Sequence, residues 1–201
     1  GGDQIVVLRG IPWAQYDALC RARSDTAGPR LAYLDGDLEI VSPGRRHETE
    51  KTVLARLLEI FALENRVPLN GFGSETFRKK AKKAGVEPDE CYSIGHARKF
   101  PDLAIEVVET SGGVDKLEAY RRLGIGEVWY LIDARIYVYS LERGRYRLQD
   151  GSVVLPQVDL GEIARIATST NPERQTEAVA AFWRALRRRK RTKKSPRMSK
   201  R

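Results

Sequence analysis

The stretch Asp102-Leu-Ala-Ile-Glu-Val-Val-Glu109 decides the fold. It is nearly all apolar and rich in β-branched residues, which is typical of a central strand covered on both faces. Residues 127–132 form a second apolar strand, and residues 114–123 between the two have helical character. A strand, a helix and a further strand in this order predict an α/β layer fold around one dominant strand.

Further elements flank this core on both sides. We expect an N-terminal helix over 11–23, a hairpin over 30–41, a long amphipathic helix over 47–64, strands over 75–78 and 87–94, a turn at Ala84-Gly85, a hairpin over 135–148 and a C-terminal helix starting at Asn171-Pro-Glu173. The sequence therefore predicts a central mixed sheet flanked by helices. We expect one domain over residues 1–186 and a basic, disordered tail over 187–201.

The net charge of +9 is concentrated in that tail. Residues 184–201 contain eleven of the 36 Lys and Arg residues and no acid, so the rest of the chain has 25 basic and 27 acidic residues. Such a segment either binds phosphates without sequence preference or serves as a solubility tail. The candidate nucleic-acid-binding residues are Arg187, Arg188, Arg189, Lys190, Arg191, Lys193 and Lys194.

Composition excludes several classes of protein. No stretch approaches the roughly 18 consecutive apolar residues of a membrane span, so we expect no membrane association. Cys20 and Cys91 are too few for a disulfide framework and form no metal-type pair, which favours a reduced, cytoplasmic protein. Two histidines, His47 and His96, leave little material for a zinc site or a histidine-based triad.

Glu106 interrupts the central strand and points to a function. It lies between Ile105 and Val107, and a carboxylate there is costly unless it is paired, hydrogen-bonded or bound to a metal. Alternation places it on the face opposite Ile105 and Val107. A structural ion pair with an arginine is one interpretation, and a metal ligand is the other.

Asp89 and Lys116 complete a candidate site. Pro88-Asp89 alone is ordinary turn chemistry, but a neighbouring strand can bring Asp89 beside Glu106. Two carboxylates, with water and substrate phosphate, suit Mg²⁺, which polarises the phosphoryl group and activates water. Lys116, near a helix start, can stabilise the transition state, although a solvated lysine is the simpler interpretation.

A third carboxylate is predicted at the start of the long helix. Glu48 and Glu50 lie in its first turns, where acids ordinarily interact with the helix dipole. We expect Glu48 to reach the metal, with His47 as a contact around the site.

This pattern resembles the PD-(D/E)XK nuclease superfamily, and in detail the Uma-two family of restriction-endonuclease-like proteins. The resemblance covers about residues 31–148. It is carried by His47-Glu48, Glu87-Pro-Asp-Glu-Cys91, Pro101-Asp-Leu-Ala-Ile-Glu-Val107, Thr110-Ser111, Lys116-Leu117, Tyr120, Leu123-Gly124 and Glu127-Val-Trp129. It implies a restriction-endonuclease-like core, and Mg²⁺ or Mn²⁺ held by Asp89, Glu106 and Glu48 for hydrolysis of DNA.

The sequence departs from the superfamily pattern at Val108, which stands where Glu-x-Lys has lysine. The resemblance to the Uma-two family transfers that role to Lys116. Asp102 competes with Asp89 for the aspartate role, because it also follows a proline. We favour Asp89, since Asp102 and Glu106 are about 13 Å apart on one strand.

Three functions fit these residues. The first is a Mg²⁺- or Mn²⁺-dependent DNA endonuclease, which we expect to be a homodimer. The second is a catalytically idle nuclease fold that binds nucleic acid through its basic tail. The third is an interaction module that dimerises through apolar strands such as residues 127–132. Convergence of Asp89, Glu106, Glu48 and Lys116 in one concave site would favour the enzyme.

Overall fold

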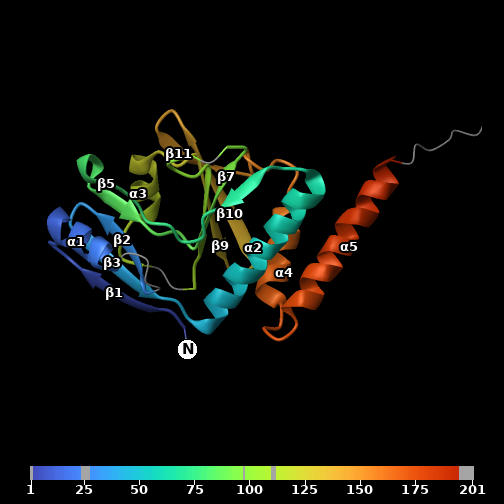
Figure 1. Ribbon diagram of the computed structural model, residues 1–201, viewed down its shortest axis with the longest axis horizontal. Helices are drawn as coiled ribbons and strands as arrows, with labels where there is room; N and C mark the ends of the chain where they lie inside the picture. Colours follow the sequence, from blue (N-terminus) through green and yellow to red (C-terminus); the bar gives the residue numbers. More distant parts are fainter. Residues whose placement is uncertain (1, 24–27, 97, 110–111, 195–201) are drawn as a thin grey trace, which may run out of the picture.

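The fold was analysed in a computed structural model, which describes residues 2–23, 28–96, 98–109 and 112–194. Two sheets and five α-helices make up this part of the chain (Figure 1). Thr110-Ser111, which belong to the family resemblance, lie outside the described residues. No helix in these ranges is long and apolar enough to cross a membrane.

The larger sheet is mixed and has six strands. Its order is β11 (Arg145–Gln149), β10 (Arg135–Glu142), β9 (Glu127–Ile132), β8 (Leu103–Val107), β7 (Glu90–Ile94) and β4 (Leu69–Gly71). β8 and β9 are parallel and are joined through α3 (Lys116–Leu123), and the other pairs are antiparallel. The predicted α/β class with a central mixed sheet is confirmed.

Both faces of β8 are covered, as its apolar sequence predicts. Leu103, Ile105 and Val107 belong to the core that contains α2 (Arg45–Asn65), α4 (Leu160–Ser169) and α5 (Gln175–Lys194). Ala104, on the opposite face, packs in the core with α3. The alternation of the strand therefore separates the core face from the face that carries Glu106.

A second, five-stranded sheet lies at the other end of the molecule from α4 and α5 (Figure 1). Its order is β1 (Gln4–Leu8), β3 (Asp37–Ser42), β2 (Arg30–Leu34), β6 (Ala84–Val86) and β5 (Phe77–Lys79), and a short 3-10 helix, η1 (Lys80–Lys82), joins β5 to β6. α1 (Trp13–Arg23) covers it, with the ring of Tyr16 stacked on that of Tyr33.

The predicted turn at Ala84-Gly85 is wrong, because both residues belong to strand β6. Gly85 lies directly under Tyr16, and a Cβ there would collide with the tyrosine hydroxyl. The glycine therefore provides space for an aromatic ring and does not form a turn.

The disordered tail predicted from residue 187 is also wrong for its first eight residues, because α5 continues to Lys194. Side-chain contacts hold this helix to the body: Trp183 Nε1 donates to Glu64 at 2.6 Å and Arg189 binds Glu162 at 2.6 and 2.9 Å. Arginine and lysine are good helix formers. Residues 195–201 lie outside the described residues.

The structure contradicts the proposed dimerisation through residues 127–132, which form strand β9. It is an interior strand, paired with β8 on one side and β10 on the other. Val128, Trp129 and Leu131 are buried within the molecule. This strand has no free edge or face for a partner.

Candidate active site

The register between β7 and β8 brings Asp89 next to Glu106. The two strands are antiparallel with Glu90 opposite Ile105, so Asp89 lies just before β7 at the carboxyl end of β8. Its amide donates to the Ile105 carbonyl at 3.1 Å. Its Oδ2 accepts from the Val107 amide at 2.6 Å. The backbone ladder therefore fixes the Asp89 carboxylate at the end of the central strand.

Helix α3 supplies two donors to Glu106. The Asp115 side chain caps this helix by accepting from the Glu118 amide at 2.9 Å, and Lys116 is the first helical residue. Lys116 Nζ donates to Glu106 Oε2 at 2.9 Å. Tyr120, one turn later on the same helix face, donates its hydroxyl to Glu106 Oε1. Each oxygen of Glu106 is held by one side chain of α3.

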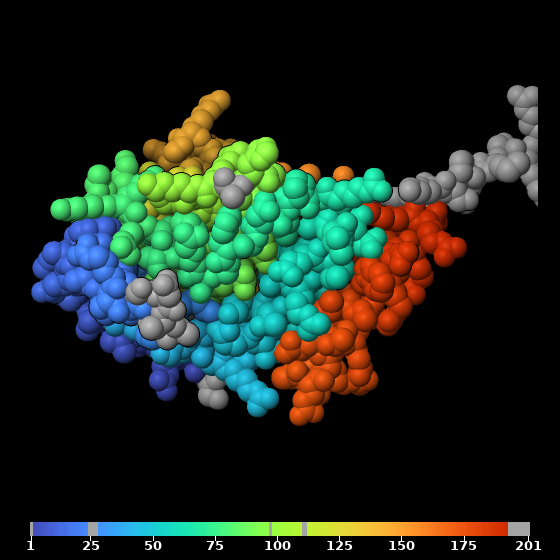
Figure 2. Space-filling model, viewed as in Figure 1, coloured from blue at the N-terminus to red at the C-terminus, as the bar shows by residue number. Residues whose placement is uncertain are grey.

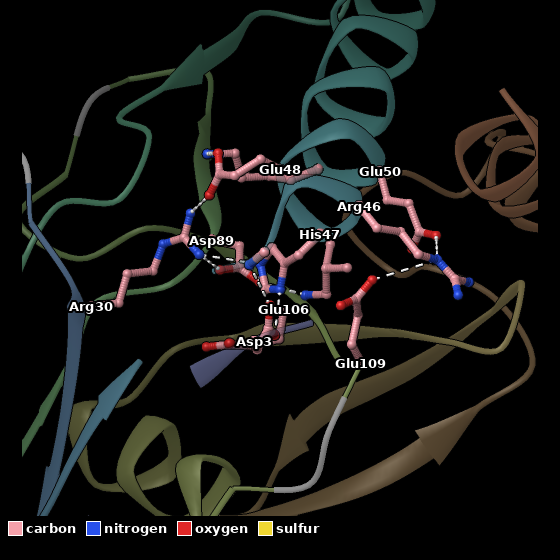
Figure 3. Close-up of polar contacts among 12 residues, drawn as sticks. Asp3, Arg30, Arg46, His47, Glu48, Glu50, Asp89, Glu106 and Glu109 are labelled. Atoms are coloured by element: carbon pink, nitrogen blue, oxygen red, sulfur yellow. Dashed lines mark hydrogen bonds and ion pairs between the residues drawn. The ribbon is translucent and has the colours of Figure 1, made fainter. Parts of the chain in front are cut away.

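His47 and Arg30 hold Asp89 from the other side (Figure 3). His47 lies in the first turn of α2, with Nε2 3.0 Å from Asp89 Oδ2 and Nδ1 2.9 Å from Asp3 Oδ2. Both ring nitrogens face carboxylates, which favours the doubly protonated imidazole, and Nε2 also lies 3.2 Å from Arg30 Nη1. Arg30 Nη1 lies 2.5 Å from Asp89 Oδ1.

These groups line one pocket of about 280 Å³. Asp89, Glu106 and Lys116, which the sequence nominates, all line it. The other titratable residues in its wall are Asp3, Glu39, His47, Asp115 and Tyr130. Figure 3 shows Asp89, His47, Glu106 and Asp3 grouped at the start of α2. Three of the four predicted catalytic residues are therefore brought together in one concave site.

Glu48 does not join them, contrary to its predicted place at the metal. Its carboxylate binds Arg30 Nη2 at 2.7 Å and Lys51 Nζ at 2.6 Å, and its side chain is 43% exposed. Successive helix residues point about 100° apart, so a helix that directs His47 into the pocket turns Glu48 away. Glu50 is bonded to Arg46 at 2.8 Å.

Asp102 lies at the opposite end of β8 from Glu106. Its Oδ2 accepts from the Ile94 amide at 2.8 Å, and its Oδ1 is 3.1 Å from Arg98. The geometry therefore favours Asp89 over Asp102 as the partner of Glu106.

Four residues that bind the side chains of the site have no role in the sequence-based prediction: Asp3, Arg30, Glu39 and Tyr120. Glu39, on β3, is 1% exposed and accepts from the amides of Gly113 and Val114 at 2.7 and 3.1 Å. It interrupts an apolar run between Leu38 and Ile40, which is the same signal that identifies Glu106. Tyr120 and Arg30 do not interrupt an apolar run in this way, so the sequence pattern does not identify them.

Glu39 connects the small sheet to the loop before α3. Its Oε1 lies 3.7 Å from Lys116 Nζ. A Cβ at Gly112 would collide with its carboxylate, and a Cβ at Gly113 would press on Val7 of β1. Glycine at these two positions therefore lets the loop carrying Lys116 pack closely against β1 and β3.

The electrostatics of the two carboxylates differ. Burial raises the pKa of Glu106, and the charge of Asp89 adds to that rise, while Lys116 and Tyr120 only partly oppose it. Burial also acts to raise the pKa of Asp89, but the hydrogen bond from His47 and the charges of Arg30, His47 and Lys116 outweigh it and lower the pKa. The site thus favours the carboxylate form of Asp89, whereas burial disfavours the charged form of Glu106 despite its contact with Lys116.

The pKa values of Lys116 and His47 are both raised by the neighbouring carboxylates. Burial acts to lower the pKa of Lys116, and the charges of Glu106 and Asp89 raise it well above its usual range. For His47, burial acts in the same direction, and bonds to Asp89 and Asp3 raise its pKa. Lys116 is therefore positively charged at neutral pH, and the site favours the protonated form of His47.

Glu127 provides a contrast, because it is also a buried strand carboxylate. It is 1% exposed and accepts from Trp129 Nε1 at 2.6 Å, Ser152 Oγ at 2.6 Å and the Val153 amide at 2.7 Å. It does not line the pocket, and the described residues place no Lys or Arg against it. Its role is to tie the segment after β11 to the sheet.

The donor set at Asp89 and Glu106 fits a hard divalent cation. A carboxylate offers about four acceptor positions, so Glu106 keeps roughly two and Asp89 roughly one after the bonds given above. Within the described ranges, no group of three His, Cys, Asp or Glu side chains is arranged to hold a metal. Two carboxylates with water are sufficient for Mg²⁺ or Mn²⁺ but not for a site built wholly from protein ligands.

Comparison with solved structures finds a chain titled a "putative nuclease belonging to DUF820" from Anabaena variabilis, with 12% sequence identity and a TM-score of 0.46, over 75% of this chain and 92% of that one. Comparison with curated proteins gives no match. The model of the Uma2 family, described as "Putative restriction endonuclease", matches residues 13–191 and confirms the family indicated by the sequence motifs. The chain belongs to the Uma2 family.

Proposed function

We propose that the protein hydrolyses phosphodiester bonds of DNA with the help of Mg²⁺ or Mn²⁺. Membership of the Uma2 family supports a nuclease role. The observation that carries the finer proposal is the convergence of Asp89, Glu106 and Lys116 in one pocket at the end of the central strand. Within that pocket the two carboxylates hold the metal.

Each side chain has a separate task in this proposal. The divalent cation, when bound, polarises the phosphoryl group and lowers the pKa of the attacking water. Lys116 Nζ offers a fixed positive charge to the negative charge that develops on the phosphate oxygens. His47 and Tyr120 keep Asp89 and Glu106 in position through the hydrogen bonds of the site.

DNA as the substrate, the homodimer and the cytoplasmic location also belong to this proposal. A homodimer would place two pockets on one duplex, so that each pocket could cut one strand. Cys20 and Cys91 are buried free thiols, which suits a reducing compartment. Sedimentation equilibrium of the purified protein tests the dimer directly.

A catalytically idle fold is the second candidate, and one observation favours it. Both oxygens of Glu106 and both oxygens of Asp89 already have protein partners, so the network is closed without a metal. A buried ion pair of this kind is also what a purely structural Glu106 would form. The two candidates differ in whether the pair is needed for chemistry.

Cleavage of supercoiled plasmid tests the proposal. The wild type should cleave with Mg²⁺ or Mn²⁺ and lose activity in EDTA. Asp89→Asn should abolish cleavage, and Asp102→Asn, the matched substitution on the aspartate at the far end of β8, should leave it intact. Cleavage that persists in EDTA would rule out the metal mechanism, and an active Asp89→Asn variant would remove Asp89 from it.

A further inference from the structure

The exposed face of α5 carries four arginines in one row. Arg184, Arg187, Arg188 and Arg191 follow the i, i+3, i+4, i+7 spacing of a single helix face, and all four are exposed. We call them the arginine stripe. Glu177, in the first turn of α5, binds Arg174, and no acidic residue follows it in the sequence, so the part of the helix that carries the stripe has no negative charge.

The rest of α5 is committed to the body of the protein. Val179 and Phe182 are buried, Leu186 packs against the core, and Arg189 forms an ion pair with Glu162. These residues lie on the face opposite the stripe. Arg189, nominated by the sequence as a nucleic-acid contact, is therefore held by a carboxylate, whereas the described residues place no carboxylate against the stripe.

The C-terminal half of α5, which carries the stripe, lies beside the C-terminal end of α2, whereas His47 lies at the start of α2; the two helices are neighbours on the surface of the molecule (Figures 1 and 2). α2 and α5 run side by side in the same direction, since Arg56 contacts Thr176 and Glu64 contacts Trp183. His47 marks the pocket, and Glu64 lies 17 residues further along α2. At 1.5 Å per residue the two positions are about 25 Å apart. The stripe starts beside Glu64 and continues away from the pocket.

From this arrangement we infer that the arginine stripe is a second nucleic-acid contact, which binds the phosphate backbone without sequence preference about 25 Å or more from the pocket. Four arginines spaced over two helical turns match a regularly repeated polyanion. A helix that binds an anionic membrane also inserts an apolar face, but the apolar face of α5 is used in the core. The inference rests on the proposed nuclease function for the identity of the polyanion.

Direct binding measures the contribution of the stripe without any cleavage. A labelled duplex of about 30 base pairs is titrated in EDTA at several salt concentrations, with fluorescence anisotropy as the signal. Changing the four stripe arginines to glutamine should weaken affinity at least tenfold and reduce the slope of log K against log salt by about 3.6, because each of the four phosphate contacts contributes about 0.9. The matched control changes four other exposed arginines to glutamine: Arg21, Arg143, Arg145 and Arg147.

The control should keep the wild-type salt slope. Equal losses in both variants would mean that net charge alone matters, and an unchanged stripe variant would mean that phosphates are bound elsewhere. Either result overturns the inference. So does unchanged DNA affinity together with lost binding to phosphatidylserine vesicles, which would assign the stripe to a membrane surface. Because this assay needs no cleavage, an inactive protein with an intact stripe effect would contradict only the proposed function.

Substrate length separates the stripe from the pocket. A hairpin with a stem of about 5 base pairs, roughly 17 Å long, is too short to span both sites, whereas a 30-base-pair duplex can reach both. The stripe variant should raise KM for the long duplex and leave KM for the short stem and kcat for both substrates unchanged. An equal rise of KM for both lengths would place the stripe within the active-site contacts and overturn its assignment as a remote site.

Discussion

Replacing Glu106 with glutamine separates a metal ligand from a structural ion pair. Glutamine keeps the shape of the side chain and still accepts the hydroxyl of Tyr120. It removes one negative charge from a pocket that also contains Asp89 and Glu39. If Glu106 holds the metal, the variant should be inactive on plasmid DNA with Mn²⁺.

The effect on stability follows from two opposing contributions. Breaking a buried ion pair usually costs about 3–5 kcal/mol, because it leaves the partner as an unpaired buried charge. In the variant, however, Lys116 Nζ still lies 3.7 Å from Glu39 Oε1 and near the negative charge of Asp89. The raised pKa of Glu106 also means that its charged form is less favourable in the folded protein than in the unfolded chain. Removing the charge in the metal-free protein should therefore leave the free energy of unfolding unchanged or raise it by about 1 kcal/mol.

Plasmid cleavage with Mn²⁺ and thermal unfolding in EDTA, performed on the same preparations, test this expectation. For a chain of this length about 1 kcal/mol corresponds to a shift in Tm of roughly 2–4 °C. An inactive variant whose Tm is unchanged or slightly higher supports the metal site. A fall of roughly 6 °C or more would make Glu106 a structural residue and would refute its catalytic assignment.

Three further predictions concern residues around the same carboxylates. Tyr120→Phe should weaken Mn²⁺ binding several-fold in calorimetry while Tm stays nearly constant, since only one hydrogen bond to Glu106 is lost; unchanged affinity would contradict a positioning role. Because the pKa of His47 is raised in the folded protein, protonation of His47 stabilises the fold below pH 6.5, and this stabilisation is lost as the pH rises through the folded pKa. The difference in Tm between wild type and His47→Gln in EDTA should therefore be larger at pH 6 than at pH 9. Glu39→Ala leaves two buried amides without an acceptor and should cost about 2–4 kcal/mol in urea unfolding, whereas Glu39→Gln keeps an acceptor and should cost less than half as much.

The central strand and its glutamate could be predicted because both signals are local. The alternation in residues 102–109 separates the two faces of the strand without knowledge of its neighbours. The position of Asp89 required one additional fact, that β7 pairs with β8 in antiparallel register. Lys116 required only that a helix begins shortly after the strand ends.

The second sheet could be predicted only in part: the hairpin expected over 30–41 forms β2 and β3, but β1, β5 and β6 are short and come from distant parts of the sequence. β1 is exposed at alternate positions and pairs with β3 across more than 30 residues. β5 and β6 have three residues each, too few for a periodic pattern. The hairpin that carries Arg30 and Glu39 could thus be predicted but not its place beside the site, and Asp3 reaches the site through the pairing of β1 with β3, which hydrophobic periodicity does not specify. The error at Glu48 has a different origin, because neighbouring helix positions point in different directions.

The charge of the pocket connects the two proposed binding sites. Five acidic residues line it, against Lys116 and His47, so without a metal it repels a phosphodiester. A bound divalent cation reverses that sign, whereas the arginine stripe is positive under all conditions. DNA affinity in EDTA should therefore come mainly from the stripe, and Mg²⁺ should add the contribution of the pocket.

A variant that binds DNA without cutting it rapidly tests this expectation. Lys116→Arg keeps the positive charge but misplaces it and should slow cleavage enough for binding to be measured. When Lys116→Arg is combined with the stripe variant, Mg²⁺ should restore DNA binding. A DNA affinity that does not respond to Mg²⁺ would contradict a metal-dependent pocket.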